Sequence, residues 1–321
     1  MKVFITRKIP ERGVALLKDA GHEVIMSEAG RVLTASELAD GGKGADGVLA
    51  QLTDKITRAV LEAWKPSVKI VANYAVGYDN FDIAAAKEFG IIMTNTPDVL
   101  TDTVAEHTFA LMLVVSHRIA EGDKFLRAGE YHGWEPELLL GDDIAYKTLG
   151  VLGFGRIGAR VVHHAVRGFG MKVLYNDIKR NEELEKEYGA VYASLEDTLK
   201  NADFVSLHVP LLPSTRHLIN AERLKMMKPT AYLINTSRGQ TVDEQALADA
   251  LKNGVIKGAA LDVFENEPDV NPLLITLPNA VLTPHIASAT LETRQKMSEV
   301  AAKNIIAVLS GRTAPNQMRA Q

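Results

Sequence analysis

The chain has 321 residues, of which 46% are hydrophobic and 24% charged, and these proportions are typical of a globular protein of about two domains. No cysteine is present, so disulfides, thiol nucleophiles and cysteine metal sites are excluded. The net charge of -4 comes without a long basic tract, and this argues against nucleic acid as a partner.

The start of the chain enters a strand-like run directly, without the apolar segment of a signal peptide. The most apolar helical run, residues 109–115, is too short to span a bilayer. We therefore expect a cytoplasmic protein with no membrane partner.

Short apolar runs alternate with helical patterns over the first part of the chain. The predicted strands are residues 3–6, 23–26, 47–52, 68–72 and 91–94. The predicted helices are residues 11–20, a segment opened by the capping box Thr34-Ala35-Ser36-Glu37, residues 57–64 and residues 83–89. Strands that alternate with helices predict a parallel sheet covered on both faces.

The pattern changes after Thr96-Pro97. Thr101 is predicted to cap a long helix over residues 102–119, whose middle is apolar on nearly all sides. A helix of this kind is deeply buried or lies in a subunit interface. A polar helix follows, and then a loop that contains Tyr131-His132-Gly133-Trp134-Glu135-Pro136.

Strands and helices alternate again from Lys147 onward. The predicted strands are residues 149–152, 172–175, 203–209, 231–236, 259–263 and 280–283. The predicted helices are one that opens at the glycines after residue 152, residues 181–188, one that begins at Ser194, residues 243–253 and an amphipathic helix over residues 291–309. The predicted fold class is α/β with two doubly wound parallel sheets, which bind ligands beyond the carboxyl ends of their strands.

A glycine motif, Gly153-Phe154-Gly155-Arg156-Ile157-Gly158, stands between a predicted strand and a predicted helix. In that context it indicates a dinucleotide site, because Gly153 permits a tight turn, Gly155 lets the backbone approach a pyrophosphate, and Gly158 lets the helix pack on the strand. Free N–H groups at the start of the helix bind the pyrophosphate. Asp177 ends the next strand, where a carboxylate accepts both ribose hydroxyls. The alternative is three glycines in ordinary turns, which the flanking elements and the acid disfavour.

Arg238, Glu267 and His285 each follow a buried strand of the second half. Each is therefore expected at the sheet edge where this fold binds ligands. Arginine grips a carboxylate with two parallel hydrogen bonds. Histidine transfers a proton near neutral pH, and a glutamate bonded to the ring fixes its tautomer and favours imidazolium. With a dinucleotide, these residues describe hydride transfer to a 2-keto acid.

Each of these residues also has a plainer interpretation. A strand-end arginine is often a surface ion pair, a histidine after a proline can satisfy a buried carbonyl, and at least one of Glu265 and Glu267 is expected to be solvated. We treat the other eight histidines as structural, namely His22, His107, His117, His132, His163, His164, His208 and His217. No His-x-x-x-His pair stands beside an acid, so no metal site is predicted.

Four segments carry a family resemblance. They are the glycine motif, Asn235-Thr236-Ser237-Arg238-Gly239, Asp262-Val263-Phe264-Glu265-Asn266-Glu267-Pro268 and Pro284-His285-Ile286. In this order and spacing they resemble the signatures of the D-isomer-specific 2-hydroxyacid dehydrogenases, over essentially the whole chain. Three further segments look most like the glyoxylate/hydroxypyruvate reductases within that family, namely Asn73-Tyr74-Ala75-Val76-Gly77-Tyr78-Asp79-Asn80, Gly133-Trp134-Glu135-Pro136 and Gly168-Phe169-Gly170-Met171.

The resemblance implies roles for the matching positions. Arg238 would bind the substrate carboxylate and keto oxygen, His285 would be the acid/base, and Glu267 would be its partner. The implied cofactor-binding residues are Gly153, Phe154, Gly155, Arg156, Ile157, Gly158, Asp177, Val209, Pro210, Thr215, Thr236, Ser237, Arg238, Asp262, His285, Ala287 and Thr103. The implied substrate-binding residues are Val76, Gly77, Leu52, Arg238, Ser288 and Trp134.

Some of these roles are more specific. By the same resemblance, Val76 and Gly77 would offer backbone N–H groups to the carboxylate. Thr103 would line the nicotinamide pocket, and Asp262 would contact the carboxamide. In relatives of this kind the tryptophan loop reaches the neighbouring subunit's site, so Trp134 becomes a substrate-pocket candidate and a homodimer is implied.

The resemblance further implies that residues 1–99 and 287–321 form a flavodoxin-like substrate-binding domain and that residues 100–286 form a Rossmann-type NAD-binding domain. Several glyoxylate reductases carry small or basic residues after the second strand of the cofactor domain and use NADP(H). Here Asp177 repels a 2′-phosphate and favours NAD(H), while Lys179 and Arg180 keep NADP(H) possible.

The activity implied is the NADH-dependent reduction of glyoxylate or hydroxypyruvate to the D-2-hydroxy acid. The alternatives are another D-2-hydroxyacid dehydrogenase, of the D-lactate or phosphoglycerate type, and an NADH-sensing binding protein of the corepressor kind. A formate dehydrogenase is disfavoured. Its substrate needs no acid/base pair of a histidine with a glutamate, whereas Glu267 is present in this chain.

Overall fold

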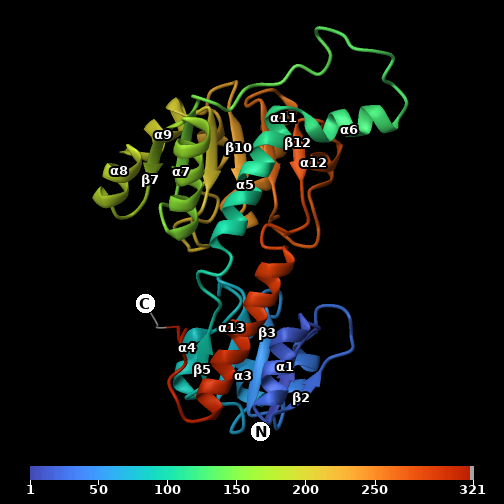
Figure 1. The fold of residues 1–321 in the computed structure, drawn as a ribbon, viewed down its shortest axis with the longest axis vertical. Helices are drawn as coiled ribbons and strands as arrows, with labels where there is room; N and C mark the ends of the chain where they lie inside the picture. Colours follow the sequence, from blue (N-terminus) through green and yellow to red (C-terminus); the bar gives the residue numbers. More distant parts are fainter. Residues whose placement is uncertain (319–321) are drawn as a thin grey trace. The chain divides into compact units, whose positions relative to one another are not determined.

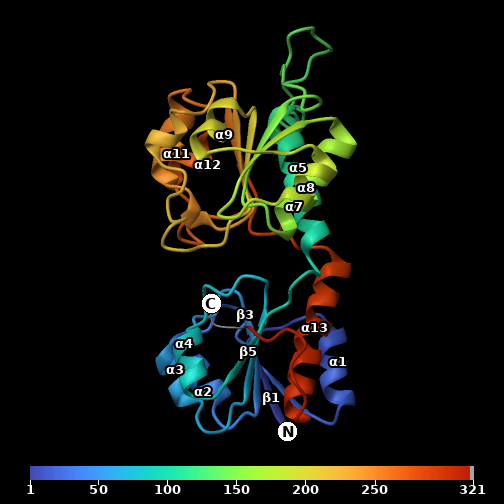
Figure 2. The same cartoon turned by 90° about the vertical axis from the view of Figure 1, so that its left-hand side faces the viewer.

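The computed structural model describes residues 1–318, drawn as a ribbon in Figure 1. The chain forms two compact units, the first made of Met1–Leu100 with the residues from Ala289 onward, the second of Thr101–Ser288. Each unit has a parallel sheet with helices on both faces, which confirms the predicted α/β class (Figure 2). Within the described range, no helix is long and apolar enough to cross a membrane.

The first unit has the strand order β2-β1-β3-β4-β5, which is the flavodoxin-like order. Its strands are β1 (Lys2–Ile5), β2 (Glu23–Met26), β3 (Gly47–Gln51), β4 (Ile70–Tyr74) and β5 (Ile92–Thr94). Its helices are α1 (Glu11–Asp19), α2 (Ala35–Gly42), α3 (Arg58–Ala63), α4 (Ile83–Glu88) and α13 (Leu291–Leu309). In Figure 2, α1 and α13 cover one face of the sheet, and α2, α3 and α4 cover the other.

Local chemistry starts some of these helices as predicted. Thr34 and Glu37 form the capping box of α2, each side chain bonding the other's backbone N–H. Thr57 is the N-cap of α3, but its side chain makes no capping hydrogen bond. Burial holds α3 instead, since Val60 and Leu61 are fully covered in the core.

The second unit has the strand order β12-β11-β10-β9-β6-β7-β8, which contains the Rossmann order. Its strands are β6 (Thr148–Leu152), β7 (Lys172–Asn176), β8 (Val191–Tyr192), β9 (Phe204–Leu207), β10 (Tyr232–Asn235), β11 (Gly258–Leu261) and β12 (Ala280–Leu282). Its helices are α5 (Thr101–Ser116), α6 (Ile119–Arg127), α7 (Arg156–Phe169), α8 (Glu182–Tyr188), α9 (Leu195–Asn201), α10 (Ala221–Leu224), α11 (Glu244–Lys252) and α12 (Pro272–Thr276). In Figure 2, α5, α7 and α8 lie on one face and α9, α11 and α12 on the other.

The apolar helix α5 is shorter than predicted. It ends at Ser116 rather than near residue 119, because Arg118 has a φ of 55° in the left-handed region, which breaks the helix before α6. Its apolar residues Phe109 and Met112 are buried in the core of the second unit.

The carboxyl ends of β10, β11 and β12 meet at one edge of the second sheet. Asn235 pairs in register with Leu261, and Leu261 with Leu282. The turns that follow these three strands therefore start side by side. These turns carry Arg238, Glu267 and His285, which are expected at one edge of the sheet.

Candidate active site

The glycine motif forms a tight turn between β6 and α7. Gly153 has a φ of +96°, and a Cβ there would lie 2.7 Å from the backbone of His208. A Cβ on Gly158 would lie 2.1 Å from the Gly153 carbonyl oxygen, so only glycine lets α7 approach the strand this closely. Gly155, the N-cap of α7, is exposed and has open space where a side chain would stand. This turn fits a pyrophosphate against the start of α7.

The carboxylate of Asp177 is joined to that turn. Its Oδ2 accepts the N–H of Phe154 at 2.6 Å, which brings the acid beside the glycine loop. The next residue, Ile178, is apolar and fully exposed, and no sequence pattern indicates this exposure. Arg180 is held by two hydrogen bonds of 2.8 Å to Glu185. Arg180 and the Tyr175 hydroxyl lower the pKa of Glu185 to about 2, so this ion pair persists at neutral pH.

A buried asparagine shapes the turn that carries Arg238. Asn235 Nδ2 donates to the Arg238 carbonyl at 2.9 Å, and its Oδ1 accepts the N–H and the hydroxyl of Ser237. Gly239 packs so closely that a Cβ would lie 1.9 Å from the backbone of Phe264. These contacts hold the turn after β10 against the turn after β11.

His285 and Glu267 form a pair. His285 Nδ1 lies 2.9 Å from Glu267 Oε2, with the two side chains 30% and 29% exposed. Burial alone would raise the pKa of Glu267, but the His285 bond and charge, the Phe264 N–H and the Arg238 charge outweigh it and lower that pKa. Glu267 is therefore ionised at neutral pH, and Nδ1 of the ring faces it, which leaves Nε2 for a ligand.

The prediction that Glu265 or Glu267 is merely solvated is wrong. Glu265 Oε1 lies 2.7 Å from His217 Nε2 and 3.4 Å from Arg216. The two glutamates bind different histidines, because Gln240 Nε2 donates to the Glu265 carbonyl and keeps this residue beside the 216–217 segment. Only the three-dimensional arrangement assigns each acid its partner.

The Asp262 carboxylate is fully buried and holds the turn with His285. Its Oδ1 accepts the Thr283 hydroxyl at 2.7 Å and the Ile286 N–H at 2.8 Å, and its Oδ2 accepts the Ala287 N–H at 2.8 Å. His107 Nε2, from α5, lies 3.4 Å from Oδ1. Burial raises the pKa of Asp262, but these donors outweigh it and the net shift is downward. The implied contact of Asp262 with a carboxamide stays a prediction.

The remaining implied cofactor residues of the second unit lie near the same strand ends. Thr103 is in the first turn of α5, and Thr236 follows β10, where its hydroxyl lies 3.1 Å from that of Thr108. Val209 and Pro210 follow β9, and the Thr215 hydroxyl donates to the Pro210 carbonyl at 2.6 Å. Ser288, an implied substrate-binding residue, is the last residue of the unit, directly after the His285 turn.

His208, which precedes Val209, is not a competing acid. Burial lowers the pKa of His208 to about 3, so the ring is neutral at physiological pH. Its Nε2 lies 2.8 Å from the Ser206 hydroxyl. This histidine is structural, as predicted.

In the first unit, the implied substrate residues follow adjacent strands. Leu52 comes directly after β3, and Val76 and Gly77 come after β4, at the carboxyl edge set by the pairing of Gln51 with Tyr74. Two asparagines hold this second turn. Asn73 Nδ2 donates to the Gly77 carbonyl and Asn95 Nδ2 to the Val76 carbonyl, each at 2.8 Å. No local sequence pattern indicates this role for either asparagine, because each bond depends on the fold of the turn.

Trp134 lies on the segment between α6 and β6, which loops away from the sheet of its unit (Figure 1). Its side chain is 81% exposed. Leu140, Tyr131 and Tyr146 of the same segment are also exposed. Large apolar side chains gathered on one exposed segment are a feature of interaction surfaces.

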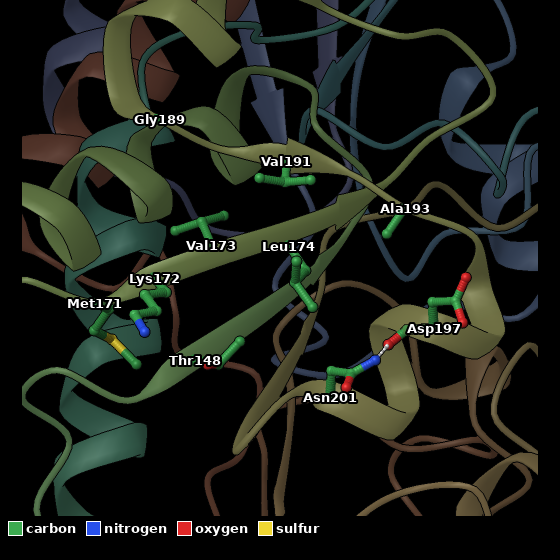
Figure 3. A pocket seen from close by; sticks show the side chains of 10 residues that line it. All are labelled: Thr148, Met171, Lys172, Val173, Leu174, Gly189, Val191, Ala193, Asp197 and Asn201. Carbon is green, nitrogen blue, oxygen red and sulfur yellow. Dashed lines mark hydrogen bonds between the residues drawn. The ribbon is translucent and has the colours of Figure 1, made fainter.

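A groove of about 620 Å³ is separate from these residues. It is lined by Thr148 and Lys172, the first residues of β6 and β7, together with Leu174, Val191 and Asn201 (Figure 3). The groove thus includes the amino ends of the two strands, whereas the glycine loop leaves the carboxyl end of β6. In the part of the chain described, none of the implied site residues lines it, and we assign it no ligand.

A Rossmann sheet with a glycine turn, an acid after its second strand and an imidazole–carboxylate pair at its edge defines a class, the nicotinamide-dependent oxidoreductases.

Comparison with known proteins identifies the family within this class. Residues 109–287 match the model of the D-isomer specific 2-hydroxyacid dehydrogenase, NAD binding domain. A glyoxylate reductase of Pyrococcus furiosus is 48% identical over 318 residues, which cover 98% of this chain and 94% of that one. The chain belongs to the D-isomer-specific 2-hydroxyacid dehydrogenases.

Solved structures agree with this assignment. The TT0316 protein from Thermus thermophilus superposes with a TM-score of 0.93 at 43% identity, over 99% of this chain and 100% of that one. An NADPH-dependent glyoxylate/hydroxypyruvate reductase from Sinorhizobium meliloti superposes with a TM-score of 0.85 at 34% identity, over 99% and 96% of the two chains.

Proposed function

We propose that the protein reduces glyoxylate, or a similarly small 2-keto acid such as hydroxypyruvate, with NADH. The product is the 2-hydroxy acid, of D configuration where it is chiral. The observation that carries this proposal is the pair of His285 and Glu267 at 2.9 Å, at the sheet edge that also carries Arg238. The glyoxylate reductases among the relatives support the choice of substrate.

The chain's own residues supply the proton and the binding groups. The glycine turn at the start of α7 would hold a dihydronicotinamide dinucleotide, which would supply the hydride for C2 of the keto acid. The Nε2–H of a protonated His285 gives its proton to the keto oxygen, and the ring is left neutral. Glu267 stabilises the protonated ring beforehand and fixes its orientation through Nδ1. Arg238 binds the carboxylate through two parallel hydrogen bonds.

A panel of 2-keto acids tests this function. The purified protein is mixed with NADH and one of glyoxylate, hydroxypyruvate, pyruvate or a larger keto acid. We expect it to consume NADH fastest with glyoxylate and hydroxypyruvate. Loss of the nicotinamide absorbance band measures the rate. No turnover with any member would favour the NADH-sensing binding protein, and a preference for pyruvate would favour a D-lactate type of enzyme.

We infer that NADH is preferred over NADPH. Asp177 lies beside the glycine loop, where its charge would repel a 2′-phosphate. Arg180 would otherwise be available to bind that phosphate, but it is hydrogen-bonded to Glu185. The relative from Sinorhizobium meliloti is NADPH-dependent, so the two cofactors need direct comparison. We expect kcat/KM to be at least about tenfold higher with NADH, equivalent to about 1.4 kcal/mol.

A variant tests the reason for this preference. Glu185→Gln releases Arg180 and should raise kcat/KM for NADPH without improving NADH. Glu187→Gln on the same helix is the matched control and should change neither value. Equal use of both cofactors by the unaltered enzyme would contradict the role of Asp177.

We further propose a homodimer in which the segment that carries Trp134 packs on a second copy and completes its substrate pocket. The exposed Trp134, Leu140 and Tyr146 of this segment support the proposal. Light scattering should give twice the mass of the chain, and Trp134→Ala should change the selectivity among 2-keto acids. A monomer, or an unchanged selectivity, would make the tryptophan a packing residue only. The cytoplasmic location stays a prediction that cell fractionation can test.

A further inference from the structure

The turn that carries His285 is wrapped around one buried carboxylate. Asp262 accepts the Ile286 and Ala287 N–H groups with its side chain and the His285 N–H, at 2.9 Å, with its backbone carbonyl. Three consecutive backbone donors of the turn therefore end on a single residue. The position of Asp262 determines the path of the chain through residues 285–287.

His285 needs this support because its backbone is unfavourable. Its φ of 53° is in the left-handed region, where the Cβ of any residue other than glycine crowds the following carbonyl oxygen. Such a conformation persists only when the surrounding structure enforces it. The direction of the imidazole follows from this backbone, so the hydrogen bonds to Asp262 also set how Nδ1 meets Glu267.

His107 reaches the same carboxylate from a different element. Its Nε2 lies 3.3 Å from the Thr283 hydroxyl and 3.4 Å from Asp262 Oδ1, with the side chain 19% exposed. A fully buried carboxylate needs donors or an opposite charge to offset the water it has lost. Two backbone N–H groups and one hydroxyl are neutral donors, and the imidazole of His107 is the one basic side chain that the described structure places within ion-pair distance of Asp262.

The neighbouring residue on α5 makes a parallel contact. Thr108 donates to the Val104 carbonyl at 2.8 Å, and its hydroxyl lies 3.1 Å from that of Thr236, in the turn after β10. Consecutive residues of α5 therefore engage the turns that carry Arg238 and His285. This helix is more than a cover for the sheet.

We propose that His107 is a positioning residue for His285 and acts through the carboxylate of Asp262. This inference rests on the proposed function, in which His285 is the proton donor. His107 makes no described contact with the His285 ring, so its effect is on the orientation of the donor and not on the proton transfer itself. Replacing His107 should reduce kcat and leave the binding of the keto-acid carboxylate, which falls to Arg238, nearly unchanged.

Steady-state kinetics with NADH and glyoxylate test the proposal. His107→Leu should lower kcat at least about tenfold with a change in KM for glyoxylate below about threefold. His107→Gln keeps an N–H donor near the place of Nε2 and should recover kcat to within about threefold of the unaltered enzyme. His163→Leu, on α7, is the matched control and should keep the kcat of the unaltered enzyme.

Amide hydrogen exchange provides a readout that needs no turnover. The N–H groups of Ile286 and Ala287 should exchange at least about tenfold faster in His107→Leu than in the unaltered protein or in His163→Leu. If His107→Leu does not fold, Thr283→Val removes another donor to the same Oδ1 and should show both effects. Unchanged exchange and unchanged kcat would overturn the positioning role.

These readouts separate two failures. If the unaltered protein reduces no 2-keto acid, the proposed function fails, while the exchange rates still show whether His107 holds the turn. If reduction occurs and His107→Leu loses kcat without recovery in His107→Gln, the histidine is only a packing residue and the inference fails.

Discussion

The turn after β4 in the first unit and the turn after β12 in the second are held in opposite ways. After β4, neutral amides hold carbonyl oxygens, with Asn73 on Gly77 and Asn95 on Val76, each at 2.8 Å. After β12, the charged carboxylate of Asp262 holds N–H groups. The first turn is fixed through its acceptors and the second through its donors.

This difference decides what each turn can offer a ligand. In a planar trans peptide the C=O and the following N–H point in opposite directions. Amides that hold the Val76 carbonyl therefore turn the Gly77 N–H away from themselves, as a site for an anion requires. Where a carboxylate takes the N–H groups, the backbone donors are used, and the His285 side chain is the group left for chemistry. Four substitutions test how these turns and the side chains they carry serve the reaction.

The largest effect is expected from Asp262→Asn. An amide in place of the carboxylate sets its own N–H against the donors of the turn and leaves at least one buried N–H unpaired, which costs about 1 to 3 kcal/mol of stability. We expect kcat to fall by about 10³-fold, since the Ile286 and Ala287 N–H groups lose the carboxylate that fixes the turn after His285. Asp203→Asn is the control, because Asp203 also bonds a backbone N–H, at the amino end of the sheet. A variant within tenfold of the normal kcat would show that the charge does not hold the turn.

Arg238→Lys should have the next largest effect. It asks whether the second unit recognises the substrate carboxylate with a side chain, since an ammonium keeps the charge and loses the planar two-pronged match. A loss of about 10²-fold in kcat/KM is expected, equivalent to about 2.7 kcal/mol. Arg216→Lys should stay near the normal value. If Arg238→Lys also stays within threefold, Arg238 is a structural ion pair.

Glu267→Gln should shift the pH range of reduction. Reduction needs the protonated ring, so activity holds at low pH and falls as pH rises. The lowered pKa of Glu267 keeps it ionised over the range measured, and its charge favours imidazolium. Without that charge the alkaline limb of kcat/KM for glyoxylate should move to lower pH.

Profiles from pH 5 to 10 with saturating NADH check this shift. The oxidation of the hydroxy acid needs the neutral ring and should show the opposite limb. Glu265→Gln is the control, since Glu265 binds His217 instead. A limb that stays in place in Glu267→Gln would refute the pairing.

The lowered pKa of Glu267 also affects the stability of the fold. The stabilisation by its charge is present above the pKa of an unfolded glutamate and is lost as pH falls through the lowered value.

The smallest effect is expected from Asn95→Asp. A carboxylate cannot donate to the Val76 carbonyl and repels it, so the turn should lose its orientation toward an anion. We expect KM for glyoxylate to rise about tenfold, or about 1.4 kcal/mol, with little change in kcat. Asn279→Asp is the matched control, because the amide of Asn279 likewise donates to backbone carbonyls, those of Leu251 and Lys257. Equal KM values for the two variants would mean that the first turn does not bind the substrate.

Much of this architecture follows from local sequence patterns. Apolar runs of four to six residues fix where strands lie, and the capping box at Thr34 and the glycines at 153–158 fix where helices begin. Short elements such as β8 and α10 were not predicted, because two to four residues are too few to show a periodic pattern. The expectation that Arg238, Glu267 and His285 lie at the ligand-binding edge of the sheet needed only the position of each residue directly after a buried strand.

Only the tertiary structure decided which side chains became partners. His107 and Thr283 are 176 positions apart, and their contact depends on how α5 is rotated against the sheet. The same holds for Glu265, which contacts His217, 48 positions away, and not solvent. Composition and spacing cannot encode these pairings, because each one results from the packing of elements that are distant along the chain. The sequence by itself determined the chemistry available at the sheet edge, and the packing of α5 and the strand-end turns determined how that chemistry is held in place.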